Sequence, residues 1–282
     1  MSLPLPDHIS YSYLHLFMGC PYAAFLRYEA AMRGGSSVWL ALGNGLHYTL
    51  EAAHRDNNFN LKSWASLFRA EYNRIINEEE VFVNYPQLKK SENDGISMLE
   101  MYHGQVESGQ ITKYPLAVEK AFRIPFAGTS IVGRIDKTEE DDGLTVIDYK
   151  SGKSKPDAWS LRHNVQLTTY YWAGKEIYGR YPKKLVWHHL RTGERLETER
   201  TPKDIDNLKR MIENALLMRE KGIIHRVYDD NICGDGSGRG MQCDYRGAVC
   251  DDEDLEQRTL AKIRLASERG AVEYLDLDGD AD

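Results

Sequence analysis

Hydrophobic residues in the first third of the chain recur at the spacing of an amphipathic helix. Ser10 and Ser12 are suitable N-cap residues, and the hydrophobic residues after them lie three or four positions apart. The residues that would share one helix face are Leu14, Phe17, Met18, Tyr22, Phe25 and Leu26. The same spacing predicts further helices over 38–54 and 61–76. We therefore expect a helical region at about 10–110.

The hydrophobic spacing changes to every second residue after Leu116, which is typical of β-strands. The pattern then predicts a strand from 116, a turn at 128–129, and strands over 130–137 and 144–150 joined by a turn at 141–143. A helix over 164–178 and a strand over 184–190 follow. After a turn at 192–193, the pattern predicts a strand ending at 200 and a helix from 201. This order of helices, a three-stranded meander, a helix and a strand predicts an α/β fold.

The composition favours a globular protein. The chain has 282 residues, of which 41% are hydrophobic and 28% charged. No apolar stretch approaches the roughly 20 residues that a membrane-spanning helix needs, and the N-terminus lacks the basic and apolar regions of a signal peptide. We therefore expect a soluble cytoplasmic protein with no membrane partner.

Acidic residues are concentrated at the C-terminus. Residues 251–282 contain 11 acidic and four basic residues, which leaves 32 of each in residues 1–250. The net charge of −7 thus lies in the tail, and the neutral body neither predicts nor excludes a nucleic-acid partner. No linker or repeat divides the body, so we expect one domain over 1–250, with a core at about 116–200 and a C-terminal region at 201–250, followed by an acidic tail at 251–282.

Two aspartates and a lysine are predicted to meet on the meander. Asp148 and Lys150 project from the same side of the third strand, and Asp136 can lie beside Asp148 across the hairpin. The two carboxylates could hold a hard divalent cation, and the lysine could orient a water nucleophile or stabilise a negatively charged transition state. Phosphodiester hydrolysis uses these groups. The alternative is a solvated turn over 136–142 and a surface ion pair between Asp148 and Lys150.

Three motifs around these residues resemble those of a known enzyme family. They are Gly133-Arg134-Ile135-Asp136, Ile147-Asp148-Tyr149-Lys150-Ser151-Gly152, and the pair Gln166 and Tyr170, four residues apart. They are similar to motifs of the PD-(D/E)XK nuclease superfamily, in its RecB-like branch. The resemblance implies a restriction-endonuclease-like αβββαβ core with an N-terminal helical elaboration and a C-terminal cysteine cluster. It also implies a metal-dependent deoxyribonuclease.

The resemblance assigns a role to each matching residue. The implied ligands of Mg2+ or Mn2+ are His47, Asp136, Asp148, the backbone carbonyl of Tyr149 and, less specifically, Glu119. The implied catalytic residues are Asp136, Asp148, Lys150, Gln166 and Tyr170, of which the last two would contact DNA or support the metal site. Taken alone, His47 could instead be a packed or surface histidine, and Tyr170 could be a core residue.

The chain has four cysteines, which is the number that binds one zinc ion or one iron–sulfur cluster. They are Cys20, Cys233, Cys243 and Cys250, and the last three lie within a Gly-rich stretch of 18 residues. They could also be unrelated buried thiols. Their placement resembles the split ligand set of the iron–sulfur members of this branch, such as the AddB nuclease domain and the four-cysteine CRISPR-associated exonucleases. The resemblance implies a structural [4Fe-4S] cluster, with zinc as the alternative.

The leading hypothesis is a metal-dependent DNA exonuclease that acts on single strands or DNA ends. One alternative is an iron–sulfur DNA-binding or assembly subunit, with recombination or CRISPR adaptation proteins as partners, and another is a structure-specific endonuclease. A phage or prokaryotic source would suit each of these. Candidate strand-binding residues are Tyr11, Tyr13, Arg27, Tyr28, Trp159, Arg162 and His163. Each of these could equally be a core aromatic residue or a surface charge.

Overall fold

The computed structural model describes residues 5–30, 32, 37–78, 85–227, 233, 243, 245 and 250. The predicted acidic tail at 251–282 lies outside these residues. The chain divides into two compact units, which are described separately here. The first unit comprises residues 1–34, 125–132 and 209–282, and the second comprises residues 35–124 and 133–208. The expectation of one domain over 1–250 stays a prediction.

The N-terminal segment of the first unit is mainly helical. Strand β1 (Ile9–Ser10) pairs in parallel with residues 131 and 132 of β3 (Thr129–Asp141). Ser10 then caps α1 (Tyr11–Gly19), because its side chain accepts a hydrogen bond from the Tyr13 N–H. The short helix α2 (Pro21–Ala24) and the π-helical turn η1 (Phe25–Glu29) follow.

The predicted continuous helix from residue 10 to residue 26 is wrong, because it is interrupted at Cys20. Cys20 has an extended backbone (φ −150°, ψ 104°), which the ring of the following Pro21 favours. Met18, which the spacing placed on the buried face, is 52% exposed. The steric effect of one proline therefore overrides the hydrophobic spacing.

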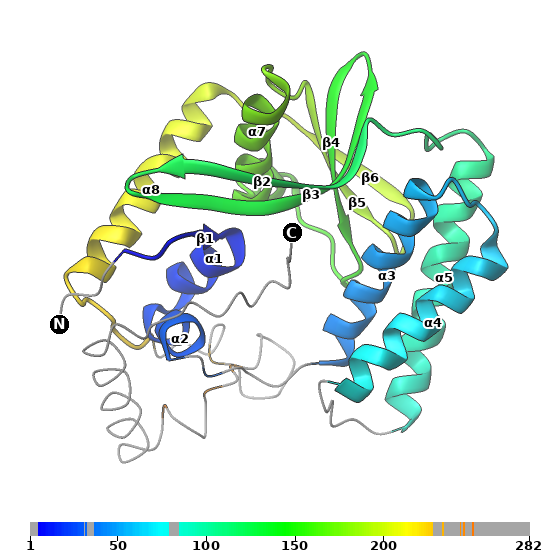
Figure 1. Ribbon diagram of the computed structural model, residues 1–282, viewed down its shortest axis with the longest axis horizontal. Helices are drawn as coiled ribbons and strands as arrows, with labels where there is room; N and C mark the ends of the chain where they lie inside the picture. The colour runs from blue at the N-terminus through cyan, green and yellow to red at the C-terminus, as the bar shows by residue number, and fades with distance from the viewer. Residues whose placement is uncertain are drawn as a thin grey trace. The chain divides into compact units, whose positions relative to one another are not determined.

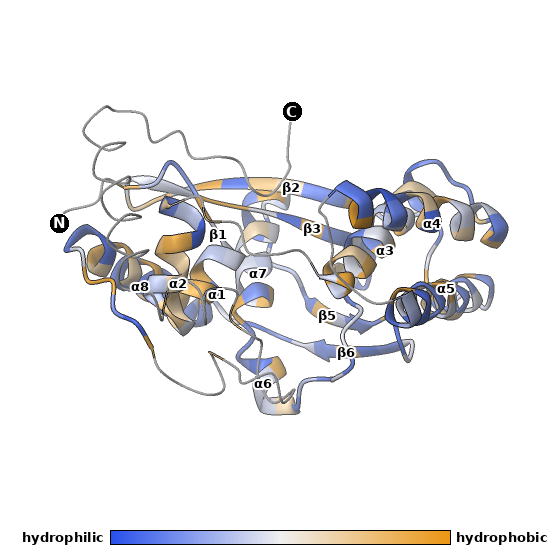
Figure 2. Cartoon of the chain, turned by 90° about the horizontal axis from the view of Figure 1, so that it is seen from below, coloured by the Kyte–Doolittle hydropathy of each residue, from blue (hydrophilic) through white to orange (hydrophobic). Residues whose placement is uncertain are grey.

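Three long helices of the second unit pack side by side (Figure 1). They are α3 (Val38–Arg55), α4 (Leu61–Glu78) and α5 (Tyr85–Glu107), and the first two confirm the predicted ranges. Figure 2 shows hydrophobic and hydrophilic residues mixed along α3 and α4, and the hydrophobic ones contribute to a buried cluster. Phe68 lies in this cluster against Gly45 and Gly95, where an added Cβ at Gly95 would overlap its ring. Close packing of the three helices thus needs the glycine.

The sheet of the second unit contains the predicted meander. Its strands are β2 (Ala117–Phe126), β3, β4 (Gly143–Lys150), β5 (Lys184–His189) and β6 (Glu194–Thr198). The order is β3-β4-β5-β6, with β2 paired to β3, and β4 and β5 are parallel. Helices α6 (Ala158–Arg162) and α7 (Val165–Tyr178) form the crossover between these parallel strands.

The β2–β3 turn is one residue earlier than the sequence pattern predicts. Ala127 and Gly128 have φ values of 51° and 80°, the left-handed pair that a two-residue type I′ hairpin turn requires. Glycine takes this backbone conformation without a Cβ penalty. Thr129 is therefore the first residue of β3 rather than part of the turn.

Helices cover both faces of the sheet in the second unit. Ile147, Tyr149 and Val186 join the buried cluster of α3, α4 and α5. On the opposite face, Thr138 contacts Tyr178 of α7 through a 2.9 Å hydroxyl hydrogen bond. Helix α8 (Pro202–Glu220) follows β6. The order α3, β2, β3, β4, α7, β5 confirms the predicted mixed α/β fold.

In the part of the chain that the structure describes, no helix has both the length and the apolar character needed to cross a bilayer.

Candidate active site

The candidate site lies where the pairing between β3 and β4 ends. The last paired residues are Lys137 of β3 and Ile147 of β4, whereas β4 remains paired with β5 as far as Lys150. One residue beyond that last pair, the register places Asp136 opposite Asp148. The Asp136 Oδ2 atom accepts a hydrogen bond from the Tyr149 N–H at 2.6 Å. The carboxylate of Asp136 thereby satisfies a backbone donor of β4 next to the point where pairing ends.

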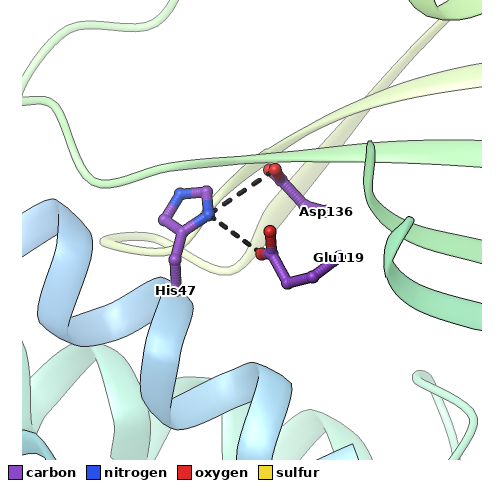
Figure 3. A group of neighbouring side chains, drawn as sticks. All are labelled: His47, Glu119 and Asp136. Carbon is purple, nitrogen blue, oxygen red and sulfur yellow. Dashed lines mark ion pairs between the residues drawn. The ribbon is translucent and has the colours of Figure 1, made fainter. Parts of the chain in front are cut away.

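Three possible metal ligands converge at this opening (Figure 3). The Nδ1 atom of His47 lies 3.5 Å from Glu119 Oε1 and 3.5 Å from Asp136 Oδ1. The three residues come from α3, β2 and β3, and one ligand atom of each lies within 4.8 Å of the others. His47 lies in the middle of α3, within the helix that the sequence predicted over 38–54.

Glu119 reaches the site through an irregular stretch of β2. Its φ of 44° is unusual for a residue other than glycine, and the next two residues, Lys120 and Ala121, are both exposed. Two exposed neighbours break the alternation that continues at Phe122 and Ile124, as at a β-bulge. Alternation in the sequence therefore could not indicate which way Glu119 points.

Asp148 and Lys150 begin a hydrogen-bonded chain on the α7 face of the sheet. Lys150 Nζ donates to Asp148 Oδ1 at 2.9 Å and to Gln166 Oε1 at 2.8 Å. Gln166 Nε2 in turn donates to the Tyr170 hydroxyl at 3.0 Å. The Tyr170 ring is buried and lies edge-on to Phe122, so this residue belongs both to the core and to the network. The sequence-predicted residues Asp148, Lys150, Gln166 and Tyr170 are thus brought together.

The buried charges shift one another's protonation. Burial alone would lower the pKa of His47, but the carboxylates of Asp136 and Glu119 outweigh it and raise that pKa to about 9. Burial raises the pKa of Asp148 to about 6 against the opposing charge of Lys150. Burial also raises the pKa of Asp136, and His47 opposes this shift. Without a metal ion, a proton on His47 therefore compensates the two carboxylates beside it.

The donor set fits a hard divalent cation. With bonds of about 2.1 Å, an octahedral Mg2+ holds neighbouring ligands about 3 Å apart and opposite ligands about 4 Å apart. The 3.5 Å separations at His47 need only small movements to reach these values. Asp148 Oδ2 is buried, has no hydrogen bond, and lies 2.8 Å from Lys150 Nζ as an ion pair. This oxygen is a further suitable ligand, and the assignment of the Tyr149 carbonyl stays a prediction.

Two residues that the sequence did not indicate hold the segment after β4. His189 contributes its Nε2 to a 2.8 Å hydrogen bond with the Gly152 carbonyl, and Arg191 donates to the Ser151 carbonyl at 3.4 Å. Arg191 also pairs with Asp94 of α5. These contacts fix the backbone just beyond Lys150. No local sequence signal distinguishes them from ordinary polar residues of a strand end.

The four cysteines lie in the first unit. Cys20, Cys243 and Cys250 belong to one hydrophobic cluster with Tyr22 and Tyr245, so segments more than 200 residues apart in the sequence meet there. Cys233 adjoins the cluster, because its carbonyl accepts from the Cys243 N–H at 3.1 Å and its thiol donates to the Val227 carbonyl. Within the described residues, His47, Glu119 and Asp136 are the one group with three ligand atoms inside 4.8 Å, so no three cysteine sulfurs are that close.

The candidate strand-binding residues differ in their surroundings. Tyr13 is a buried core residue, whereas Trp159 is 71% exposed and stacks on His163 with ring centroids 4.4 Å apart. Arg162 makes a two-point ion pair with Asp204 at 3.0 and 3.1 Å. Of the other members of the predicted set, the Tyr11 ring stacks on His15, and Arg27 lies over the Tyr28 ring.

Comparison with known proteins identifies the class of this fold and site. The chain matches the model of the PD-(D/E)XK nuclease superfamily over residues 8–251. It therefore belongs to this superfamily. No curated protein matches the chain significantly.

Two solved structures are similar to the chain. A candidate exonuclease from Eubacterium rectale has a TM-score of 0.51 and 11% identity, covering 79% of this chain and 85% of that one. At this identity the likeness concerns the fold alone. A second structure, of the protein SSO0001, has a TM-score of 0.34 and 12% identity, covering 77% of this chain and 79% of that one.

We expect binding of Mn2+ to release a proton from His47, because the ion requires the neutral imidazole. Since the pKa of His47 is raised to about 9, the affinity for Mn2+ should rise about tenfold per pH unit between pH 7 and pH 9 and level off above it. Calorimetry in buffers of different ionisation enthalpy should detect about one released proton at pH 7. His47→Gln should remove this pH dependence. Constant wild-type affinity across this pH range would contradict the assignment.

Proposed function

We propose that the chain is a metal-dependent DNA exonuclease of the RecB-like branch, acting on single strands or DNA ends. The observation that carries the proposal is the convergence of His47, Glu119 and Asp136 beside Asp148 and Lys150 at the point where β3 and β4 separate. Membership of a nuclease superfamily supports this chemistry. DNA is the substrate that the superfamily suggests.

The roles of the residues follow from their contacts. His47, Glu119, Asp136 and Asp148 would hold Mg2+ or Mn2+, which when bound would polarise the scissile phosphate and lower the pKa of a water molecule. Lys150 places a positive charge beside Asp148, where it can orient the attacking water and offset charge that develops on the phosphate. Gln166 accepts a hydrogen bond from Lys150 and so limits where the ammonium group can lie.

Preference for unpaired DNA is supported by one exposed aromatic pair. Trp159 and His163 stack on each other at the surface, on a short helix whose Asp157 cap accepts from the Ser160 N–H at 2.6 Å. Aromatic rings at a surface bind unpaired bases by stacking, whatever the sequence. The two-point pairing of Arg162 with Asp204 assigns this arginine to the structure rather than to the strand.

The cysteines of the first unit would hold a structural [4Fe-4S] cluster. Four thiolates on one zinc ion, with Zn–S bonds of about 2.3 Å, would lie about 3.8 Å apart. In an iron–sulfur cluster each thiolate binds a different iron, so the sulfurs lie farther apart. Cys20, Cys243 and Cys250 share one hydrophobic cluster and Cys233 is hydrogen-bonded to Cys243, which supports a metal centre shared by the four cysteines.

Lys150→Met should lower the rate of DNA cleavage by about 10²- to 10³-fold, because it removes a charge that stabilises the transition state. The assay uses Mn2+ with linear single-stranded DNA labelled at either end and with a single-stranded circle. Lys184→Met is the matched control, since Lys184 of β5 forms an exposed ion pair with Glu197 of β6. This variant should cleave DNA at the wild-type rate.

Each alternative predicts a different result in this assay. Cleavage of the circle would identify an endonuclease. DNA binding without cleavage by the wild-type protein, at any metal concentration, would instead support a binding or assembly subunit.

Protein purified without oxygen should be brown and contain about four iron atoms per chain if the cysteines bind a cluster. Cys243→Ser should lose the colour and the iron, because it removes a ligand. Its Mn2+ affinity should be retained, since the His47 ligand group lies in the other unit. A colourless wild-type protein with one zinc ion per chain would contradict the cluster and identify a zinc site instead.

A further inference from the structure

Helix α3 and the segment after β4 run alongside each other in opposite directions. The His47 ring lies edge-on to Tyr149 with centroids 5.8 Å apart. One helix turn earlier, a Cβ added at Gly43 would lie 3.5 Å from Ser151 Oγ. Another turn earlier, Lys153 Nζ lies 4.9 Å from the centre of the Trp39 ring. The two segments therefore lead from the metal ligands to the start of α3.

We propose that Trp39 and Lys153 bind the unpaired nucleotides next to the scissile phosphate, with a base stacked on the indole and a phosphate on the ammonium group. The inference rests on the proposed nuclease function. Trp39 is 38% exposed, which is high for so large an aromatic side chain. It lies eight residues from His47, about 12 Å along the helix. At about 3.4 Å or more per nucleotide, this distance spans roughly two to four nucleotides.

The contact is held in place on both sides. Ser37 caps α3 by accepting from the Leu40 N–H at 3.2 Å, which fixes the turn that carries Trp39. His189 holds the carbonyl of Gly152, the residue before Lys153. The flexible stem of the lysine allows its charge to move from the ring face to a phosphate. Bases in a duplex already stack on each other. Only an unpaired strand therefore has bases that can stack on the Trp39 indole.

The test is binding of a fluorescent single-stranded oligonucleotide in Ca2+, with cleavage measured separately in Mn2+. Trp39→Ala should weaken binding about tenfold, because one stacked base contributes about 1–3 kcal/mol. Lys153→Ala should weaken it and reduce the salt dependence by about one phosphate contact. Tyr181→Ala is the matched control, since Tyr181 forms a similar exposed pair with Lys175 at 5.3 Å and should bind normally.

The outcomes separate this inference from the proposed function. If the wild-type protein cleaves DNA but Trp39→Ala binds as tightly as Tyr181→Ala, the strand contact is wrong and the nuclease stands. If the wild-type protein neither binds nor cleaves DNA, both fall. A dinucleotide, which is too short to reach Trp39, should be cleaved equally by the wild type and Trp39→Ala, and unequal rates would also overturn the contact.

A separate observation concerns the opposite side of the same strands. Lys137 and Tyr149 directly follow Asp136 and Asp148, so they point through the sheet toward α5. There the Tyr102 hydroxyl lies 2.8 Å from the Tyr149 hydroxyl, 3.2 Å from Lys137 Nζ and 2.7 Å from His54 Nε2. His54 lies on α3, seven residues after His47. One hydroxyl thus contacts all three elements that carry His47, Asp136 and Asp148.

The directions of these hydrogen bonds are fixed by chemistry. The Lys113 carbonyl can only accept, so His54 donates from Nδ1 at 3.2 Å and a neutral ring then accepts at Nε2. Burial lowers the pKa of His54 to about 4, which keeps the ring neutral. Tyr102 therefore donates to His54, and its oxygen accepts from Lys137. Glu139 balances the buried charge of Lys137 at 2.9 Å.

We infer that Tyr102 is a positioning residue for the metal site, because its hydroxyl holds the backbones that carry His47, Asp136 and Asp148 in mutual register. Tyr102→Phe should weaken Mn2+ binding at least tenfold, as loss of outer contacts does at metal sites. Tyr72→Phe is the matched control, because Tyr72 is equally buried and, among the described residues, its hydroxyl forms hydrogen bonds with Ser91 and Leu88 of α5.

Both variants should lower the unfolding temperature to a similar degree, and only Tyr102→Phe should change Mn2+ affinity in calorimetry. Equal Mn2+ affinity of Tyr102→Phe and Tyr72→Phe would overturn the inference. If Tyr102→Phe does not fold, His54→Leu cuts the connection to α3, together with the His54 bond to the Lys113 carbonyl, and should weaken Mn2+ binding in the same way. If His54→Leu then binds Mn2+ as tightly as the wild type, the positioning role of Tyr102 is overturned.

Discussion

The separation of β3 from β4 is the constraint on which the candidate site depends. If the two strands stayed paired beyond Lys137 and Ile147, the backbone of β3 would take the Tyr149 N–H and Asp136 would have no reason to turn toward it. Because pairing stops there, the Asp136 carboxylate accepts that N–H and keeps its other oxygen near His47. The parallel pairing of β4 with β5 meanwhile holds Asp148 and Lys150 in place. An opening at a strand end thus gathers ligands without a long loop.

The candidate site brings several carboxylates close together, and their negative charges must be compensated. Asp136 and Asp148 face a low-dielectric interior, which raises the pKa of each carboxyl group and opposes its ionisation. The protein offsets this with a protonated His47 on one side and Lys150 on the other. A divalent cation would replace the single charge on His47 with a double one at the centre of the same oxygens. The arrangement is therefore better suited to the metal-bound state than to the metal-free one.

Local patterns predicted much of this, and they failed where an irregular backbone interrupted the pattern or where the partners of a residue lay far along the chain. Alternation and turn residues located the meander, and the register across its hairpin placed Asp136 opposite Asp148, as expected. Glu119 was indicated only by the resemblance, less specifically than the other ligands, and its left-handed backbone breaks the alternation that could otherwise have placed it. The helix through Cys20 was mispredicted because Pro21 acts on its neighbour irrespective of hydrophobic spacing. Tyr102 and His189 left no signal, since their partners lie 35 or more positions away.

Helix α3 carries one residue of each proposed group: the strand contact, the metal ligands and the Tyr102 connection. A single straight element carries Trp39, His47 and His54, so a shift of the helix would move the strand contact, the metal ligand and the Tyr102 connection together. The helix is held by close packing of Phe68 against Gly45, which leaves little freedom for sliding. Precision at His47 is thus set by apolar packing and by a buried hydroxyl on the far side of the sheet. The candidate ligands need not themselves be rigid, because the elements that carry them are.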